Sequence, residues 1–254
     1  MIPPTESCTA QASKIGSRQG MFASIAPWYD FLNHTLSLGL DIYWRKRLIQ
    51  SLEPGSGENI LDLAAGTLDV TAGLLRKEPA CRVFAADISL PMLLFGKKKI
   101  LGKETGQQRI CADARHIPLF PASVHKVSIA FGIRNIQPRE QAYEQILHIL
   151  KPGGRLAILE FGSAKAKIWH GVYNLYLQRV LPFVGRLVSR DSQAYSYLAR
   201  SILEFPSAPE LATELQQAGF CRVSHQHLTS GIVNIHVAHK PGSSWPRPCQ
   251  PLPR

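Results

Sequence analysis

Five short runs of β-branched and apolar residues, separated by stretches with a helical pattern, constrain the fold of this chain more than any other feature. The runs are NILDLA, RVFAAD, QRICA, HKVSIAF and GRLAILEF, all between residues 59 and 161. Strands that alternate with helices predict a parallel sheet covered by helices on both faces. The helix before the fifth run has apolar residues at helical spacing, and Pro152-Gly153-Gly154 is expected to stop it; those residues are Ala142, Ile146, Ile149 and Leu150.

Two further runs near the end of the chain predict a hairpin. CRVSHQH and IVNIHVA are joined only by Leu228-Thr229-Ser230-Gly231. Such a short connection cannot be a parallel crossover, so this pair of strands must be antiparallel. Five parallel strands followed by an antiparallel pair are the arrangement of the class I methyltransferase sheet. The sequence therefore predicts an α/β, Rossmann-like fold with a seven-stranded, mostly parallel sheet.

The length and composition favour one globular domain with additions. The chain has 254 residues, of which 45% are hydrophobic and 19% charged, as in ordinary folded proteins. We expect a flexible leader over 1–20, a single domain over 21–240 and a disordered tail over 241–254, where five of fourteen residues are proline. Within the domain, 21–52 is expected to be a helical cap and 162–203 a helical insertion.

Several classes of protein are excluded by composition. No apolar run approaches the ~20 residues that span a bilayer, and the polar first twenty residues do not resemble a secretory signal. A cytoplasmic location is the expectation. The five cysteines are scattered and form no C-x-x-C pair, which argues against disulfides and zinc, and no metal site is predicted. The net charge of +11 allows nucleic acid, an anionic membrane or acidic ligands as partners without choosing among them.

The loop after the first run carries the first candidate site residues. Its sequence from Asp62 to Asp69 is DLAAGTLD, with one glycine and two acids. A dinucleotide enzyme would present G-x-G-x-x-G here, because carboxylates repel a pyrophosphate. Acids suit the cationic amino and sulfonium groups of S-adenosylmethionine. We assign Asp62, Gly66, Thr67 and Asp69 to this cofactor, although Asp69 alone could equally be a simple helix cap.

Acids at the ends of the next two strands complete the pattern. Asp87 ends the second run, twenty-one residues after Gly66, where a carboxylate can accept both ribose hydroxyls. Asp113 follows the third run and could accept from the adenine amino group, with the backbone beside Ala114 reading the ring edge; it could also be a turn residue. The joint occurrence of three acids at consecutive strand ends predicts a bound S-adenosylmethionine.

The sequence resembles the ubiquinone/menaquinone biosynthesis C-methyltransferase family (UbiE type) from about Met21 to His239. The stretch Phe131-Gly132-Ile133-Arg134-Asn135 is specific to this family, whereas Leu150-Lys151-Pro152-Gly153-Gly154 is shared by many methyltransferases. Further matching stretches are Met21–Ala26 with Tyr29-Asp30, Leu36–Gly39 with Trp44-Arg45, Leu181-Pro182 with Gly185, and Thr229–Val233. The resemblance implies methyl transfer from S-adenosylmethionine to a ring carbon of a polyprenylated hydroquinone, in menaquinone or ubiquinone synthesis.

Two positions depart from the family pattern. Leu68 stands where the family usually has a second loop glycine, so its side chain either crowds the methionine end of the cofactor or turns into the core. Position 130 is alanine where relatives can carry serine, so a hydroxyl contact there is absent.

The resemblance and the chemistry of a hydroquinone suggest three catalytic residues. The ring becomes more nucleophilic when a hydroxyl loses its proton. Arg134 could stabilise the developing phenolate or orient a water that removes the proton; alternatively it ties the strand end to an acid such as Asp30. Asn135 could hold the cofactor's amino-acid end or the substrate oxygen. Tyr29 is a candidate lid over the ring, or a packing aromatic.

A polyprenylated substrate resides in the bilayer, so we expect peripheral contact with the inner membrane face. Residues 161–203 carry six Lys or Arg and one Asp among aromatic side chains, as an interfacial surface would. The alternative is an ordinary cap with a solvated basic face, and no RNA-binding module is present. A homodimer or a quinone-synthesis complex is a further possible assembly. Rival functions are a methyltransferase for another phenolic molecule and a non-catalytic scaffold.

Overall fold

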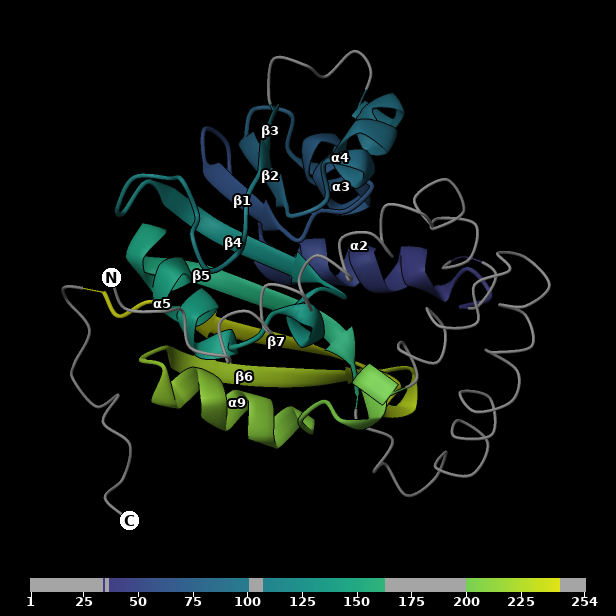
Figure 1. The fold of residues 1–254 in the computed structure, drawn as a ribbon, viewed down its shortest axis with the longest axis vertical. Helices are drawn as coiled ribbons and strands as arrows, with labels where there is room; N and C mark the ends of the chain where they lie inside the picture. The colour runs from purple at the N-terminus through teal and green to yellow at the C-terminus, as the bar shows by residue number, and fades with distance from the viewer. Residues whose placement is uncertain (1–33, 35–36, 101–106, 163–199, 243–254) are drawn as a thin grey trace, which may run out of the picture.

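The computed structural model of the protein describes residue 34 and residues 37–100, 107–162 and 200–242. Its centre is one seven-stranded sheet with strand order β3-β2-β1-β4-β5-β7-β6 (Figure 1). The strands are β1 (Asn59–Leu63), β2 (Arg82–Asp87), β3 (Gln107–Cys111), β4 (Val124–Ala130), β5 (Leu150–Phe161), β6 (Cys221–Leu228) and β7 (Val233–His239).

The pairing confirms the predicted fold class. Strands β3, β2, β1, β4 and β5 run parallel, whereas β7 pairs antiparallel with both β5 and β6. From β1 the chain first adds β2 and β3 on one side, then crosses to β4 and β5 on the other. This reversal beside β1 opens a crevice at the carboxyl ends of the strands, where ligands bind in open α/β sheets.

Helices cover both faces of the sheet. The longer ones are α2 (Leu40–Leu52), α3 (Asp69–Lys77), α4 (Leu90–Phe95), α5 (Arg139–Ile149) and α9 (Ala208–Gln217), and 3₁₀ turns are η1 (Gly96–Ile100), η3 (Ile133–Asn135) and η5 (Thr229–Gly231). One buried cluster joins α2, α3 and α4 to the sheet, and a second joins α5 and α9 to the other face. Successive residues of a strand face opposite sides of the sheet, and β1 is apolar on both sides: Ile60 belongs to the first cluster, and Leu61 and Leu63 belong to the second.

Helix α5 does not end at the predicted stop, Pro152-Gly153-Gly154. Helix α5 already ends at Ile149, and the next residue, Leu150, pairs with Val124 of β4. The Pro-Gly-Gly stretch therefore lies within β5, where the register with β4 shifts between Val124 and Lys126. Gly153 allows this irregularity, because its φ of 77° is a conformation that other residues rarely adopt.

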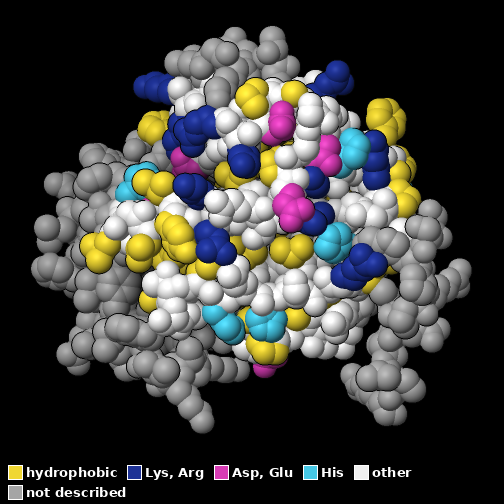
Figure 2. Space-filling model, turned by 180° about the vertical axis from the view of Figure 1, so that it is seen from behind, with side chains coloured by type: hydrophobic (Ala, Val, Ile, Leu, Met, Phe, Trp, Pro, Cys, Tyr) yellow, Lys and Arg dark blue, Asp and Glu magenta, His cyan; other side chains and the backbone are white. Residues whose placement is uncertain are grey.

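The remaining predictions concern the charged surface, the absence of a membrane-spanning helix, and the leader, cap, insertion and tail. Seen from behind, the molecule shows Lys and Arg side chains interspersed with hydrophobic ones (Figure 2). Among the described residues, no helix is long and apolar enough to cross a bilayer. The leader over 1–20 and most of the predicted insertion and tail lie outside the described residues, as do residues 21–33 and 35–36 of the cap; helix α2 belongs to the described part of the cap.

Candidate functional site

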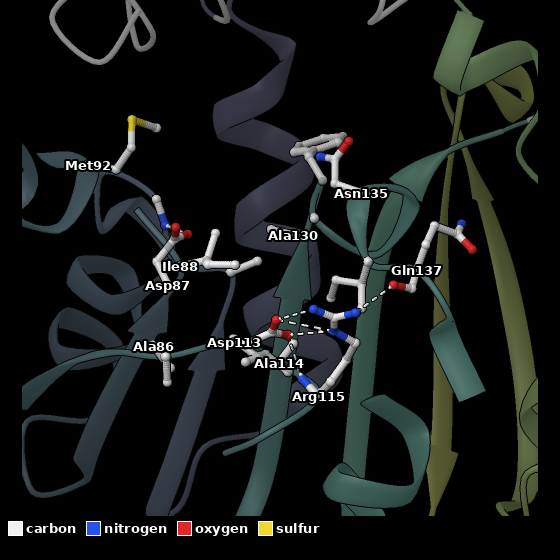
Figure 3. Close-up of a pocket in the computed structure, with 17 residues that line it drawn as sticks. Ala86, Asp87, Ile88, Met92, Asp113, Ala114, Arg115, Ala130, Asn135 and Gln137 are labelled. Atoms are coloured by element: carbon white, nitrogen blue, oxygen red, sulfur yellow. Dashed lines mark hydrogen bonds and ion pairs between the residues drawn. The ribbon is translucent and has the colours of Figure 1, made fainter. Parts of the chain in front are cut away.

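A pocket opens at the carboxyl ends of β1, β2 and β4 (Figure 3). It holds about 900 Å³ of space, part of it open to solvent. Small residues widen it, because alanine and glycine stand where the strands turn into loops; they are Ala64, Gly66, Ala86, Ala112, Ala130 and Gly132. The volume and the apolar lining are those of a site for a small organic molecule.

The loop between β1 and α3 shapes one wall of this pocket. Ala64, Gly66 and Leu68 all have positive φ values, of 56°, 51° and 66°, so the chain turns sharply before α3 begins. A Cβ built on Gly66 would lie 3.6 Å from Cε of Met92, across the pocket lining. Leu68 turns into the core, where its side chain is fully buried, and it does not line the pocket.

Asp87 lies at the end of β2 and lines the pocket. Its carboxylate accepts hydrogen bonds from the backbone N–H of Gly66 and of Ser89, each 2.8 Å long. Burial raises the pKa of Asp87, while the bonds from Ser89 and Gly66 oppose that shift. Each carboxylate oxygen can accept more than one hydrogen bond, so the group is fixed in place and can still accept hydrogen bonds from a ligand in the pocket.

Asp113 and Ala114, after β3, line the same pocket. The Arg115 guanidinium donates to Asp113 through Nε, at 3.0 and 3.1 Å to the two oxygens, and through Nη2. These bonds hold the pKa of the Asp113 carboxyl below its usual value. Arg115 also donates to the Gln137 carbonyl at 3.1 Å (Figure 3). Asp113 is thus bound to a partner that sequence reasoning missed, although Arg115 is only two residues away.

Three of the predicted cofactor residues do not line the pocket. Asp62 is buried within β1 and accepts hydrogen bonds from Thr71 Oγ1 at 2.7 Å and Ser128 Oγ at 2.9 Å. Burial raises its pKa to about 6. This carboxylate ties β1 to α3 and β4, directly beneath the loop.

Thr67 and Asp69 instead contact η1 and α2. Lys99 Nζ lies 3.0 Å from Thr67 Oγ1 and 2.6 Å from Asp69 Oδ1. Arg45 of α2 approaches the other Asp69 oxygen to 3.6 Å and also pairs with Asp41. The charge of Asp69 is therefore balanced by two cations, and its cofactor role stays a prediction.

Arg134 lies in the turn that follows β4 and forms a buried ion pair. Its Nη1 donates to Glu160 Oε1 at 2.6 Å and to the Phe131 carbonyl at 2.7 Å. The side chains are 7% and 1% exposed, respectively, for Arg134 and Glu160. Nε of Arg134 is also buried and has no hydrogen-bond partner among the described residues. The Nε–H of this guanidinium is therefore a donor that no described group accepts.

An aromatic cluster stands next to Arg134. The rings of Phe131 and Phe161 lie 4.8 Å apart, and Trp44 of α2 lies 6.2 and 6.3 Å from them. The Arg134 guanidinium stacks 5.5 Å above the Phe161 ring. Phe131 and Asn135 both line the pocket. An aromatic ring bound beside Phe131 and Asn135 would contact both apolar surface and polar groups.

The sequence-predicted residues therefore divide into groups. The structure brings Gly66, Asp87, Asp113, Ala114 and Asn135 to one pocket, with Arg134 beside it. Tyr29 and Asp30 lie outside the described residues. The acid that pairs with Arg134 among the described residues is Glu160, the penultimate residue of β5, beside β4. Among the described residues, no group of three His, Cys, Asp or Glu side chains could hold a metal ion.

Comparisons with known proteins agree with this geometry. The model of the ubiE/COQ5 methyltransferase family matches residues 10–240. A demethylmenaquinone methyltransferase of Thermus thermophilus is 39% identical over 221 residues, which cover 87% of this chain and 100% of that protein. The ubiquinone/menaquinone biosynthesis C-methyltransferase UbiE of Geobacter sulfurreducens is 38% identical, over 87% of both chains.

Solved structures share the fold at lower sequence identity. A SAM-dependent methyltransferase from Aquifex aeolicus superposes with a TM-score of 0.57 at 17% identity, covering 79% of this chain and 91% of that one. The [4+2]-cyclase SpnF gives a TM-score of 0.66 at 14% identity, covering 88% and 95%. These matches concern the fold alone.

Proposed function

Because the chain belongs to the ubiE/COQ5 methyltransferase family, we propose that this S-adenosylmethionine-dependent methyltransferase methylates a ring carbon of a polyprenylated hydroquinone. The observation that carries the proposal is the similarity along the whole length of a relative named for demethylmenaquinone. Demethylmenaquinol is thus the first acceptor to test. The name of the Geobacter relative includes ubiquinone, which makes a methoxy-polyprenylbenzoquinol the second.

The residues of the pocket fit S-adenosylmethionine. Small side chains leave room for a nucleoside, and Asp87 offers fixed acceptors at the end of β2 for the two ribose hydroxyls. The backbone beside Ala114 would read the adenine edge, and Asp113 the amino group. Asp62, Thr67 and Asp69 would act by holding the loop around Gly66 rather than by lining the pocket. When bound, the cofactor supplies an electrophilic methyl group.

Arg134 and Asn135 would handle the acceptor. The buried Nε of Arg134 is a donor without a described partner, so it can donate to a ring oxygen and favour its phenolate. A cation in a water-poor site stabilises such developing charge strongly. Asn135 would orient the ring oxygen or the amino-acid end of the cofactor. Trp44, Phe131 and Phe161 would hold the ring flat and exclude water, with Tyr29 as the proposed lid.

We further propose that the enzyme works at the membrane surface, on the cytoplasmic side. Polyprenylated acceptors are dissolved in lipid, so an enzyme that binds them must meet the bilayer. The excess of Lys and Arg over Asp and Glu supports attraction to anionic lipid.

The test measures methyl transfer by the purified chain. Radiolabelled S-adenosylmethionine is incubated with detergent-dispersed demethylmenaquinol, and the product is identified by mass spectrometry. The expected product carries one new methyl group on ring carbon. Methylation of simple phenols at a comparable kcat/KM, with no transfer to the prenylated quinol, would overturn the proposal. Quinone profiles of a deletion strain with and without this chain test the same point in cells.

A further inference from the structure

The segment that follows Asp87 carries an apolar ridge on the surface. It comprises α4 and η1, with the sequence LPMLLFGKKKI. Leu93 and Ile100 belong to the first buried cluster and Met92 lines the pocket, whereas Leu90, Leu94 and Phe95 are 50%, 57% and 40% exposed. Single exposed apolar side chains are common, but three large ones within six residues form a patch that water disfavours.

Lysines border this ridge. Lys97 and Lys98 are exposed, while Lys99 turns inward to Thr67 and Asp69. Within α4, Leu90 and Leu94 lie one turn apart on the same side, and Lys97 and Lys98 follow directly in the 3₁₀ turn η1. The outer side of the segment therefore combines apolar side chains with two cations. This is the composition of a surface that lies in the headgroup region of an anionic bilayer.

The ridge adjoins one wall of the pocket. Asp87, Ile88 and Met92 line the pocket (Figure 3), and Met92 belongs to the same short helix as Leu90 and Leu94. A bilayer bound through the exposed side chains of α4 would therefore lie one short helix away from the pocket.

We propose that Leu90, Leu94, Phe95, Lys97 and Lys98, here named the docking ridge, bind a bilayer that contains anionic lipid. The inference rests on the proposed function, because a bilayer-dissolved acceptor gives the docking its use. The lysines favour lipid over a second copy of this chain, since two identical basic ridges would repel each other. Docking at this site lets a prenylated ring enter the pocket without crossing water.

The experiment measures vesicle binding of the full chain. Partition coefficients are obtained by sedimentation with vesicles of phosphatidylcholine alone and of phosphatidylcholine mixed with phosphatidylglycerol. The wild type should bind the mixed vesicles more tightly, and salt should weaken this binding. Leu90→Gln with Leu94→Gln should weaken binding to both kinds of vesicle roughly tenfold or more. Lys97→Gln with Lys98→Gln should weaken it about tenfold, on the anionic vesicles only.

Matched controls make the test specific to the ridge. Phe120→Gln removes another exposed apolar side chain, 83% exposed, outside α4. Arg76→Gln with Lys77→Gln removes two exposed cations at the last turn of α3. Both controls should bind vesicles like the wild type. Equal losses in controls and ridge variants would overturn the proposal, as would ridge variants that bind normally. Self-association of the wild type that the ridge substitutions abolish, without vesicle binding, would also overturn it.

Failure of this inference and failure of the proposed function are distinguishable. With detergent-dispersed demethylmenaquinol, no bilayer is present, so the ridge variants should retain wild-type methyl transfer. With the same quinol embedded in mixed vesicles, their rate should fall in proportion to binding. Loss of transfer by the wild type in detergent would refute the proposed function, whereas normal rates of the ridge variants on vesicles would refute only the docking ridge.

Discussion

Asp87 combines two tasks in one carboxylate. It anchors the loop at Gly66 and the start of α4 at Ser89 through backbone N–H groups, and it faces the pocket. Both tasks need a charged acceptor that burial makes costly, which is why burial raises its pKa. A residue with such a pKa in a cleft is a functional candidate.

Asp87→Ala should weaken S-adenosylmethionine binding more than it weakens folding. Each charge-assisted hydrogen bond to the ribose contributes about 1.5–3 kcal/mol, which raises Kd roughly tenfold to a hundredfold. Asp87→Asn should lie between, since it keeps one acceptor oxygen. Calorimetric titration measures Kd, and Glu53→Gln, with its 69%-exposed carboxylate paired to Arg155, is the control. Unchanged affinity in folded Asp87→Ala would remove this residue from the site.

For Arg134 a catalytic role has to be separated from a structural one, because its ion pair with Glu160 also stabilises the fold. Arg134→Ala leaves Glu160 buried without its cation, which should lower stability by about 3–5 kcal/mol. If Arg134 also stabilises the phenolate, the single-turnover methylation rate should fall ~10²–10³-fold with cofactor Kd nearly intact. Arg134→Lys should recover only part of the rate, because a point charge does not reproduce the planar fork.

A double substitution separates the two roles. Arg134→Met combined with Glu160→Gln removes both charges together, so most of the stability should return. The expected rate of this double variant remains as low as that of Arg134→Ala. A stable double variant that methylates at the wild-type rate would reduce Arg134 to a structural residue.

At the scale of elements, the β1–α3 loop is held by packing from both sides. A Cβ at Gly96 would lie 2.5 Å from the Thr67 carbonyl oxygen and 2.7 Å from Cγ of Leu68, so η1 rests directly on this loop. Leu68 adopts a left-handed conformation, with φ 66° and ψ 24°, immediately before α3. Its buried side chain offsets the backbone strain that glycine would avoid.

Leu68→Gly should therefore destabilise the protein and leave cofactor binding intact. Glycine relieves about 1 kcal/mol of strain, but loss of a buried leucine side chain costs about 2–5 kcal/mol. Thermal unfolding should show a lower Tm, and S-adenosylmethionine Kd should stay near the wild-type value. Ala64→Gly, which relieves a similar φ of 56° and removes one methyl group, is the control. A large loss of affinity in folded Leu68→Gly would show that the loop itself depends on this side chain.

The strands were predictable because their apolar runs are short and bounded by turns, and because a four-residue link permits only an antiparallel pair. The start of β5 was not predictable, because Pro152-Gly153-Gly154 looks like a helix stop and because Leu150 is in a strand only through its pairing with Val124 of the neighbouring strand β4. In the site, the strand ends predicted two of the acids that line the pocket, Asp87 and Asp113, whereas Asp69, the third acid of the predicted set, contacts Lys99 instead. The Arg134–Glu160 pair joins residues 26 apart, and only the adjacency of β4 and β5 reveals it.

At the scale of the whole molecule, each face of the sheet buries a titratable group whose pKa moves in a different sense. Burial raises the pKa of Asp62 to about 6, from 3.8. Burial lowers the pKa of His236 on β7 to about 4, from 6.5, although its Nε2 lies 2.9 Å from the Ala208 carbonyl oxygen. Both groups are neutral over the same interval of pH, so the folded state carries no net charge at either position there.

These two groups should give opposite slopes of stability against pH. Folded Asp62 keeps its proton up to about pH 6, whereas the unfolded chain loses it near 3.8. The contribution of Asp62 to the free energy of unfolding is therefore complete below pH 3.8 and is lost as the pH rises through 6. Folded His236 stays neutral down to about pH 4, whereas the unfolded chain protonates near 6.5. The contribution of His236 to the free energy of unfolding is complete above pH 6.5 and is lost as the pH falls through 4.

Between pH 4 and 6 the changes in unfolding free energy that Asp62 and His236 cause should nearly cancel. A substitution of either residue alone should remove this balance. Two pKa units correspond to about 3 kcal/mol. Relative to the wild type, Asp62→Asn should gain about that much unfolding free energy as pH rises from 4 to 6, and His236→Gln should lose a similar amount. Urea denaturation at several pH values measures both differences, with Phe120→Gln as the control. Parallel pH profiles for all four proteins would show that neither buried group titrates as the fold implies.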